Sequence, residues 1–165
     1  MKKRKKINNN NNTFILSMIL IIWSQIFFFN DLYPQDAEKL KPSIIIKGSK
    51  ITVEVADTEK TRKKGMMWRH QLGKNEGMLF IYNDSATRYF WMKNTFLALD
   101  MAFIDSNMVI RTIHTANTLN DSTMFYSSYV PVKYVLEVNS GWFEEHGVSL
   151  GDTVLFDRSI IPKSK

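Results

Sequence analysis

The chain has 165 residues, with 22 Lys and Arg against 16 Asp and Glu, and no Cys. This length is typical of one domain, and a composition of 44% hydrophobic and 23% charged residues excludes a wholly disordered chain. The absence of Cys excludes disulfides, thiolate metal sites, iron–sulfur clusters and a cysteine nucleophile.

The N-terminal segment has the layout of an export signal. Five of the first six residues are basic, and residues 14–29, which follow an asparagine run, carry no charge. A basic segment before an uncharged apolar stretch is typical of secretory signals and N-terminal anchors. The stretch is sixteen residues long, between the usual lengths of a signal core and a membrane-spanning helix. We therefore expect residues 1–29 to be a signal peptide or an N-terminal membrane anchor.

The charge distribution predicts the direction of export. Basic residues hold the N-terminus in the cytoplasm, so the rest of the chain is expected to be extracytoplasmic, in the periplasm or cell envelope. The membrane would be contacted only through residues 14–29, if they stay uncleaved. Residues 30–42 are polar, contain two Pro and are expected to form a linker.

The same charge count argues against a nucleic-acid partner. Residues 1–41 hold seven basic and three acidic residues, whereas residues 42–165 hold fifteen basic and thirteen acidic residues. The net charges are therefore +4 and +2. Because most of the excess lies before the folded part, we expect no nucleic-acid binding.

A hairpin and a short helix are predicted next. The β-branched runs Ser43–Lys47 and Ile51–Ala56 are separated by a turn signal at residues 48–50. Asp57 is then placed to cap a helix that ends at Gly65.

Within this predicted helix, Glu59 and Lys63 have the spacing of an ion pair. We interpret the basic run Arg62-Lys63-Lys64 as a solvated helix end rather than a phosphate site.

Strands dominate the remainder of the chain. Apolar runs that predict strands cover Gly77–Tyr82, Arg88–Lys93, Leu99–Asp105, Met108–Ala116, Lys133–Asn139 and Thr153–Phe156. Residues 117–129 read as a long polar loop, and residues 140–146 as a second short helix. Runs that are apolar on both faces are typical of buried strands. We expect one mainly β domain (α+β minor) over residues 43–157: a compact barrel- or sandwich-like sheet with two short helices, followed by a polar tail at 158–165.

The densest cluster of candidate functional residues is Arg88–Thr95, followed by Asp100. In a strand, Tyr89, Trp91 and Lys93 would share one face, and the short connection after it would fold Asp100 back beside Lys93. An aromatic floor with a cation and a carboxylate at its rim suits a small polar ligand, such as a sugar or a carboxylate-bearing metabolite. In the alternative interpretation the aromatic residues are core, and Lys93 and Asp100 form a structural ion pair.

Glu137 is the second candidate, because it lies inside an apolar strand. Alternation places it with Val135 and Asn139, away from Leu136 and Val138. A carboxylate there must be paired, exposed or shifted in pKa; a surface-facing Glu is the alternative. The candidate ligand-binding residues are therefore Trp91, Lys93, Asn94, Thr95, Asp100 and Glu137.

No local motif of metal or cofactor chemistry is present. His70, His114 and His146 are widely spaced, and the sequence contains no nucleophile elbow, P-loop or dinucleotide fingerprint. We predict no metal and no cofactor, and the catalytic residues, if there are any, stay unassigned.

Several motifs together resemble a known family. They are Val53–Thr58, Gly65–Arg69, Glu76–Phe80, Phe90–Thr95, Leu99-Asp100, Phe103–Asp105, Tyr134–Val138, and Gly147 with Gly151-Asp152. In this order they resemble domain-of-unknown-function family 192, also called uncharacterised protein family 0127. The resemblance implies a small, mainly β domain, often exported or membrane-anchored, with no assigned activity. This chain lacks the Pro that many relatives place before the Leu-Asp pair, and the Cys pair that some carry in the loop at 117–129.

Three functions remain open at this point. The first is an extracytoplasmic binding module for a small polar ligand at the six candidate residues. The second is an envelope scaffold or interaction domain, which an exposed apolar patch would support. The third is an enzyme with Asp100 or Glu137 as general acid or base.

Overall fold

The computed structural model describes residues 41–157 and Ile160. The expected signal or anchor at 1–29 lies outside the described residues. So do the expected linker, apart from Lys41 and Pro42, and the polar tail, apart from Ile160. Within the described ranges, no helix is long and apolar enough to span a membrane.

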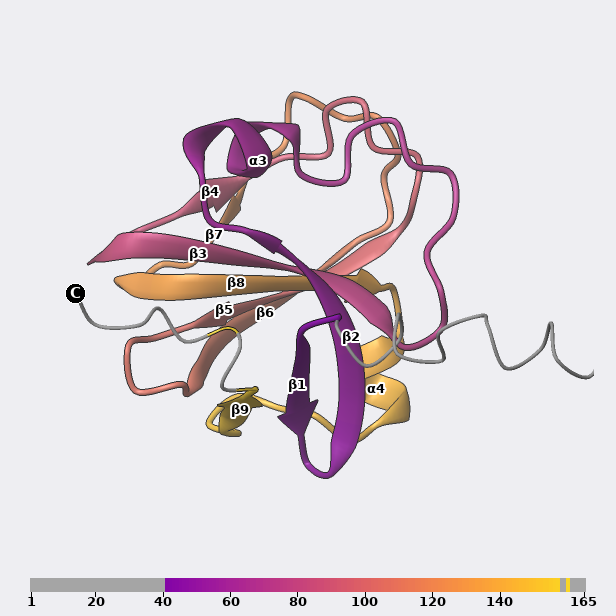
Figure 1. Ribbon diagram of the computed structural model, residues 1–165. Helices are drawn as coiled ribbons and strands as arrows, with labels where there is room; N and C mark the ends of the chain where they lie inside the picture. Colours follow the sequence, from indigo (N-terminus) through magenta and orange to yellow (C-terminus); the bar gives the residue numbers. More distant parts are fainter. Residues whose placement is uncertain (1–40, 158–159, 161–165) are drawn as a thin grey trace, which may run out of the picture. The chain divides into compact units, whose positions relative to one another are not determined.

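Seven strands form the main sheet, in the order β6-β5-β8-β3-β2-β1-β9 (Figure 1). Their bounds are β1 Ser43–Ile46, β2 Ser49–Ala56, β3 Glu76–Ala86, β5 Leu99–Ile104, β6 Ile110–Ala116, β8 Val132–Asn139 and β9 Val154–Phe156. Only β2 and β3 run parallel, and the other neighbours are antiparallel. A second, two-stranded sheet pairs β4 (Tyr89–Phe90) with β7 (Tyr126–Ser127).

The two edges of the main sheet meet at one end. An isolated bridge joins Val109, just before β6, to Thr153, just before β9. The amide of Ile110 donates to the carbonyl of Asp152 at 3.0 Å, and the amide of Val154 donates to that of Met108 at 2.8 Å. The sheet is therefore curled toward a barrel. This confirms the predicted mainly β, barrel-like fold with two short helices.

Both faces of the central strands are buried, as the continuous apolar runs predicted. One face packs the first core, inside the curl, which contains Leu79, Leu136 and Trp142. The other face packs a second core, which contains Met78, Met101 and Val135. Side chains alternate along each strand, so adjacent residues enter different cores.

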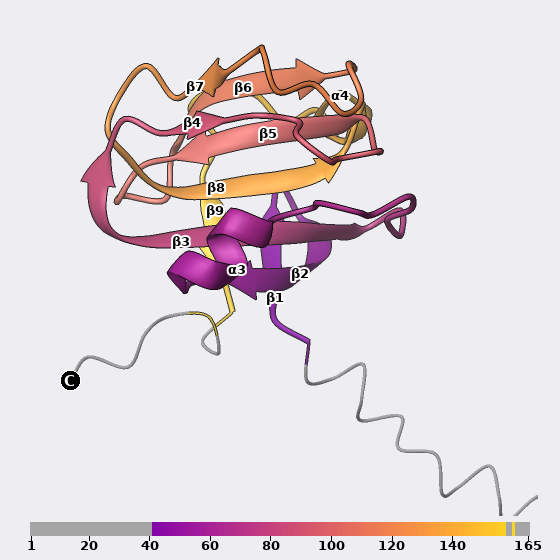
Figure 2. The same cartoon turned by 90° about the horizontal axis from the view of Figure 1, so that it is seen from above.

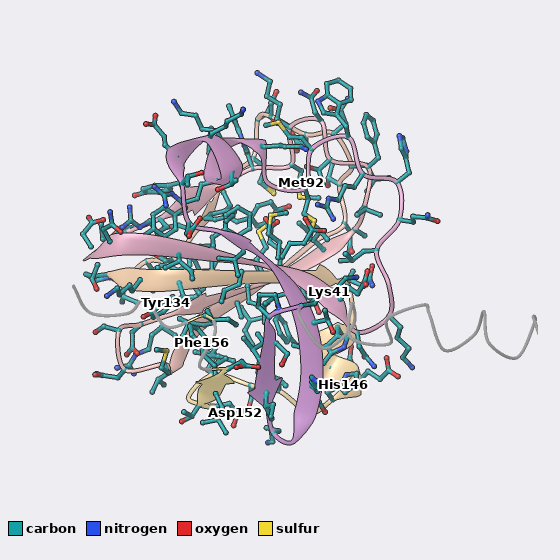
Figure 3. The ribbon with its side chains drawn as sticks, in the orientation of Figure 1. Lys41, Met92, Tyr134, His146, Asp152 and Phe156 are labelled. Carbon is teal, nitrogen blue, oxygen red and sulfur yellow. The ribbon has the colours of Figure 1, made fainter. Side chains whose placement is uncertain are left out.

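The second core is covered by α3 (Glu59–Lys64), by the β4–β7 ribbon and by long loops. These elements lie on one side of the central strands β3, β8 and β5, whereas β1, β9 and α4 (Trp142–Glu145) lie on the other. Seen from above, α3 and the ribbon stand in front of the strands (Figure 2). Met92 lies between the sheet and this cover (Figure 3), and its side chain is fully buried. The cover is the part of the fold that positions the candidate site.

Two local predictions at the start of the domain are wrong by one or two residues. The hairpin turns at Lys47-Gly48, where both residues have positive φ, rather than at residues 48–50. Thr58, not Asp57, caps α3: its hydroxyl accepts from the amide of Thr61, and the Thr61 hydroxyl in turn accepts from the Thr58 amide. The predicted Glu59–Lys63 ion pair is confirmed at 2.6 Å.

Two predictions about strand length are also wrong. The predicted strand Arg88–Lys93 shortens to Tyr89–Phe90, because the amide of Met92 donates to the carbonyl of Asp121 instead of to a strand. Conversely, β3 continues through the polar residues 83–85 to Ala86, with an irregularity in its pairing to β8. The expected loop at 117–129 contains β7.

We expect Gly77→Ala to destabilise the domain by about 1–3 kcal/mol, as overpacking does. A Cβ at Gly77 would lie 2.6 Å from the backbone oxygen of Glu137 on β8, and a main-chain neighbour cannot move aside easily. Gly73→Ala is the matched control, because the atoms nearest to its Cβ would belong to the flexible side chain of Glu76 and not to the backbone. Urea denaturation of the two variants checks this, and equal losses would contradict it.

Candidate functional site

A cavity of about 160 Å³ lies under the cover of the second core. It is lined by the end of α3, by β3, β4 and β8, and by the loop that follows β4. Four of the six predicted site residues line it: Trp91, Lys93, Thr95 and Glu137. Asn94 and Asp100 do not. The structure therefore brings most of the predicted constellation to one place.

Glu137 is the acidic residue that lines this cavity. Its side chain enters the second core between Met78 of β3 and Met101 of β5, its register partners. The residue is 4% exposed, and its Oε2 atom has no hydrogen-bond partner. A buried polar atom without a partner is rare in folded proteins. The predicted alternation holds, because Val135 and Leu136 enter different cores. The surface-facing alternative for Glu137 is wrong.

Burial raises the pKa of Glu137 to about 8, and the nearby charge of Arg69 opposes the rise only in part. Arg69 is engaged elsewhere, because its guanidinium binds the carboxylate of Glu54 at 2.6 Å. At neutral pH the Glu137 carboxyl therefore keeps its proton. A protonated carboxyl is a hydrogen-bond donor as well as an acceptor.

The raised pKa predicts a pH dependence of stability. The folded state holds a proton on Glu137 that the unfolded chain releases above about pH 4.5. The contribution of this group to the free energy of unfolding is therefore fully present below about pH 4.5, and it is lost as the pH rises toward 8. We expect a loss of about 1.4 kcal/mol per pH unit from this group, which Glu137→Gln removes. Urea denaturation of both proteins from about pH 5 to 8 measures it; parallel stability curves would contradict the burial of a neutral carboxyl.

Trp91 and Lys93 form the outer wall of the cavity. The ammonium of Lys93 lies 5.2 Å from the centroid of the Trp91 ring, as a cation–π pair. Phe125 stacks on the same ring at 5.8 Å. Trp91 is 41% exposed, whereas its neighbours Phe90 and Met92 turn inward. The predicted alternation of faces thus holds beyond the end of β4.

Asn94 and Thr95 build the turn that carries Lys93. Asn94 has a φ of 54°, and its carbonyl accepts from the amide of Trp68 at 2.7 Å. Its amide donates to the side-chain oxygen of Asn120 at 2.9 Å. Thr95 is buried, and its hydroxyl donates to the carbonyl of Lys93 at 3.3 Å. Asn94 therefore positions the wall of the cavity through its backbone.

Asp100 does not fold back onto Lys93. Its carboxylate is buried on β5 and accepts from the hydroxyl of Thr115 at 2.8 Å. It also accepts from the amides of Gly141 and Phe143, at 3.0 and 3.3 Å, at the start of α4. Asp100 thus accepts hydrogen bonds from the amides at the start of that helix. Its position in the sequence did not predict this role.

Asp100→Ala is expected to destabilise the fold by about 2–4 kcal/mol, because it leaves one buried donor and two part-buried donors without an acceptor. Asp57→Ala is the control, an exposed Asp at the start of α3. We expect that control to stay within about 0.5 kcal/mol of the wild type. Thermal and urea unfolding compare the two, and an Asp100 variant as stable as the control would contradict this assignment.

Sequence reasoning missed the cationic side of the cavity. Arg62, Lys63 and Lys64, which end α3, also line it. The Arg62 guanidinium donates to the carbonyl of Ile81 at 2.8 Å and lies over the Tyr82 ring. Because β2 leads directly into α3 and pairs with β3, the helix end lies beside the cavity. Only the parallel pairing of β2 with β3 places it there, and the sequence carried no signal of that pairing.

Exposed apolar side chains lie on the segments that line the cavity and on the loops bonded to them. We call them the aromatic rim: Trp68, Tyr89, Trp91, Leu119, Met124 and Phe125, all at least 41% exposed. The loops that carry most of them are joined by hydrogen bonds between Trp68 and Asn94, between Met92 and Asp121, and between Thr95 and Asn120. The loops that carry the aromatic rim are therefore adjacent, and Trp91 and Phe125 are in direct contact.

Other places in the described domain are poorer candidates. A larger hollow of about 470 Å³ lies along β2 near Lys41 and Glu76 and contains none of the six predicted residues. Among the described residues, no three His, Asp or Glu side chains lie together as metal ligands would.

The sequence pattern of the DUF192 family, described as "Uncharacterized ACR", matches residues 43–156. The chain belongs to this family. The match confirms the resemblance, and the DUF192 description assigns no activity. Among curated proteins, no sequence is significantly similar to the chain.

Two solved structures are similar to this DUF192 chain. A protein of Sinorhizobium meliloti 1021, described as a "putative transcription regulator", is 38% identical with a TM-score of 0.67. The alignment covers 70% of this chain and 93% of that one. A protein of unknown function from Novosphingobium aromaticivorans is 28% identical, with a TM-score of 0.66 and coverages of 73% and 96%.

Proposed function

We propose that this DUF192 protein is an extracytoplasmic binding module for a small polar ligand, held in the cavity beside Trp91 and Lys93. The unpartnered Oε2 atom of Glu137, which belongs to a residue lining that cavity, carries the proposal. A buried polar group without a protein partner is satisfied when a ligand supplies the missing hydrogen bond. Residues of five segments converge around it, which is typical of a binding pocket.

The extracytoplasmic location rests on the sequence. A basic N-terminal segment precedes an uncharged apolar stretch at residues 14–29. The described domain begins shortly after it, so export would place the cavity on the outer side of the cytoplasmic membrane.

The cavity walls favour a small ligand with both polar and apolar parts. Phe80, Tyr82 and Phe90 supply aromatic surface, whereas Lys93 and Lys64 supply charge. The volume of about 160 Å³ lies below that of pockets for drug-sized molecules. A sugar or a carboxylate-bearing metabolite fits this description.

We test the proposal by screening the full chain, purified in mild detergent, against sugars and small organic acids. A true ligand should raise the melting temperature of the wild type, and Lys93→Gln should weaken its binding about threefold to thirtyfold, the loss of one charged contact. Lys50→Gln is the matched control, because this exposed Lys lies on β2 and does not line the cavity. No shift from any compound, or equal effects of the two variants, would reject the proposal.

A second candidate function, an envelope interaction domain, is favoured by the aromatic rim. Contiguous exposed apolar surface marks interaction sites in soluble domains. Replacing Leu119 and Met124, which do not line the cavity, by Ser would reduce partner binding and leave ligand affinity unchanged if the two functions are separate. The enzyme hypothesis keeps only Glu137 as a candidate acid, since both oxygens of Asp100 are bonded within the fold.

A further inference from the structure

The charges that line the cavity are strongly one-sided. Four lining residues are cationic, namely Arg62, Lys63, Lys64 and Lys93, against the single carboxyl of Glu137. Lys63 is paired with Glu59, and Arg62 is bound to backbone carbonyls. Within the described part of the chain, Lys64 and Lys93 have no carboxylate within ion-pair distance. A ligand entering here meets positive potential first, which attracts anions and repels ammonium groups.

At the other end of the cavity, Glu137 presents a neutral acid. Its neighbours on β3 and β5 are methionines, and burial keeps the proton on. Besides the cations of α3 and Lys93, the titratable groups around the cavity are Tyr82 on β3 and Tyr89 on β4. Arg69, in the loop after α3, also affects the pKa of Glu137 through its charge. None of these is a second carboxylate that would share the Glu137 proton. The group therefore donates a hydrogen bond to whatever oxygen faces it.

We infer that the cavity binds a small organic acid as its anion, with an acidic group at Lys64 and Lys93 and a second acceptor oxygen on the proton of Glu137. This inference rests on the proposed binding function and narrows its ligand class. A neutral sugar could accept hydrogen bonds from the two lysines, but it would leave their positive charges uncompensated. An amine would have to pass the cations and force the buried Glu137 to ionise, with loss of its proton.

This arrangement couples ligand binding to protonation. The anion binds the form of the pocket in which Glu137 is protonated, so affinity is full well below the pKa of about 8 and falls above it. Between about pH 6.5 and 9 the wild type should lose about tenfold in affinity, the change in its protonated fraction. An amine would show the opposite trend: its binding would release the proton of Glu137, so its affinity would rise with pH.

The test is titration calorimetry of the full chain with pyruvate, succinate and 4-hydroxybenzoate, at both pH values and in buffers of different ionisation enthalpy. Uncharged amide analogues, ethanolamine and glucose are the matched probes, and inorganic phosphate tests whether any oxyanion suffices. We expect at least one organic acid to bind, with proton uptake at the higher pH and the tenfold loss in affinity. Glu137→Gln, which keeps an N–H donor, should bind the same acid without pH dependence, and Glu137→Leu should lose binding at both pH values.

Several results would overturn the inference. Amide analogues or ethanolamine could bind as tightly as the acids, phosphate alone could saturate the site, or none of the acids could bind. Binding of an acid could also release a proton instead of taking one up, or Glu137→Gln could show the same pH dependence as the wild type. Glucose binding that weakens in Lys93→Gln would reject the acid and keep the proposed binding function. A failure of every compound in the wider screen would reject both. Circular dichroism of each variant confirms that it is folded before its affinity is interpreted.

Discussion

The burial of the Glu137 carboxyl is the constraint on which the chemistry of the cavity depends. Because β8 is buried on both faces, the side chain at this position must enter the second core between two methionines. No protein group satisfies its Oε2 atom there. The surrounding elements then determine its chemistry: the methionines and aromatic rings keep it neutral, and the end of α3 surrounds the cavity with cations. A neutral acid behind a cationic mouth is the combination that our proposals explain.

The fold class and the facing of side chains could be predicted from the sequence, because both follow from local patterns. Continuous apolar runs predicted strands buried on two sides, and period-two alternation placed Glu137 on the same face as Val135, opposite Leu136. That this face is also buried was left open by the sequence. The same alternation placed Trp91 and Lys93 together on one face, which is exposed, opposite Met92, which is buried. Such patterns need no knowledge of distant partners.

The predictions were wrong where a specific hydrogen-bond or strand partner determines the local structure. Asp57 and Thr58 are both good helix caps, and the reciprocal bonds with Thr61 select Thr58. The strand from Arg88 ends early because the amide of Met92 bonds to the 117–129 loop. Asp100 is close to Lys93 in sequence, yet the amides of α4, some forty residues further along the chain, take its carboxylate. The cationic side of the cavity was not predicted for the same reason, because the position of the end of α3 depends on the pairing of β2 with β3.

The most direct measurement is an NMR titration of the glutamate side-chain carboxyl carbons in the ¹³C-labelled full chain, with Glu137→Gln to assign the resonance. We predict one carboxyl that titrates near pH 8 and disappears in the variant. Glutamates that all titrate at ordinary acidic pH would contradict the account, because Glu137 would then be ionised at neutral pH and repel the anion that we propose.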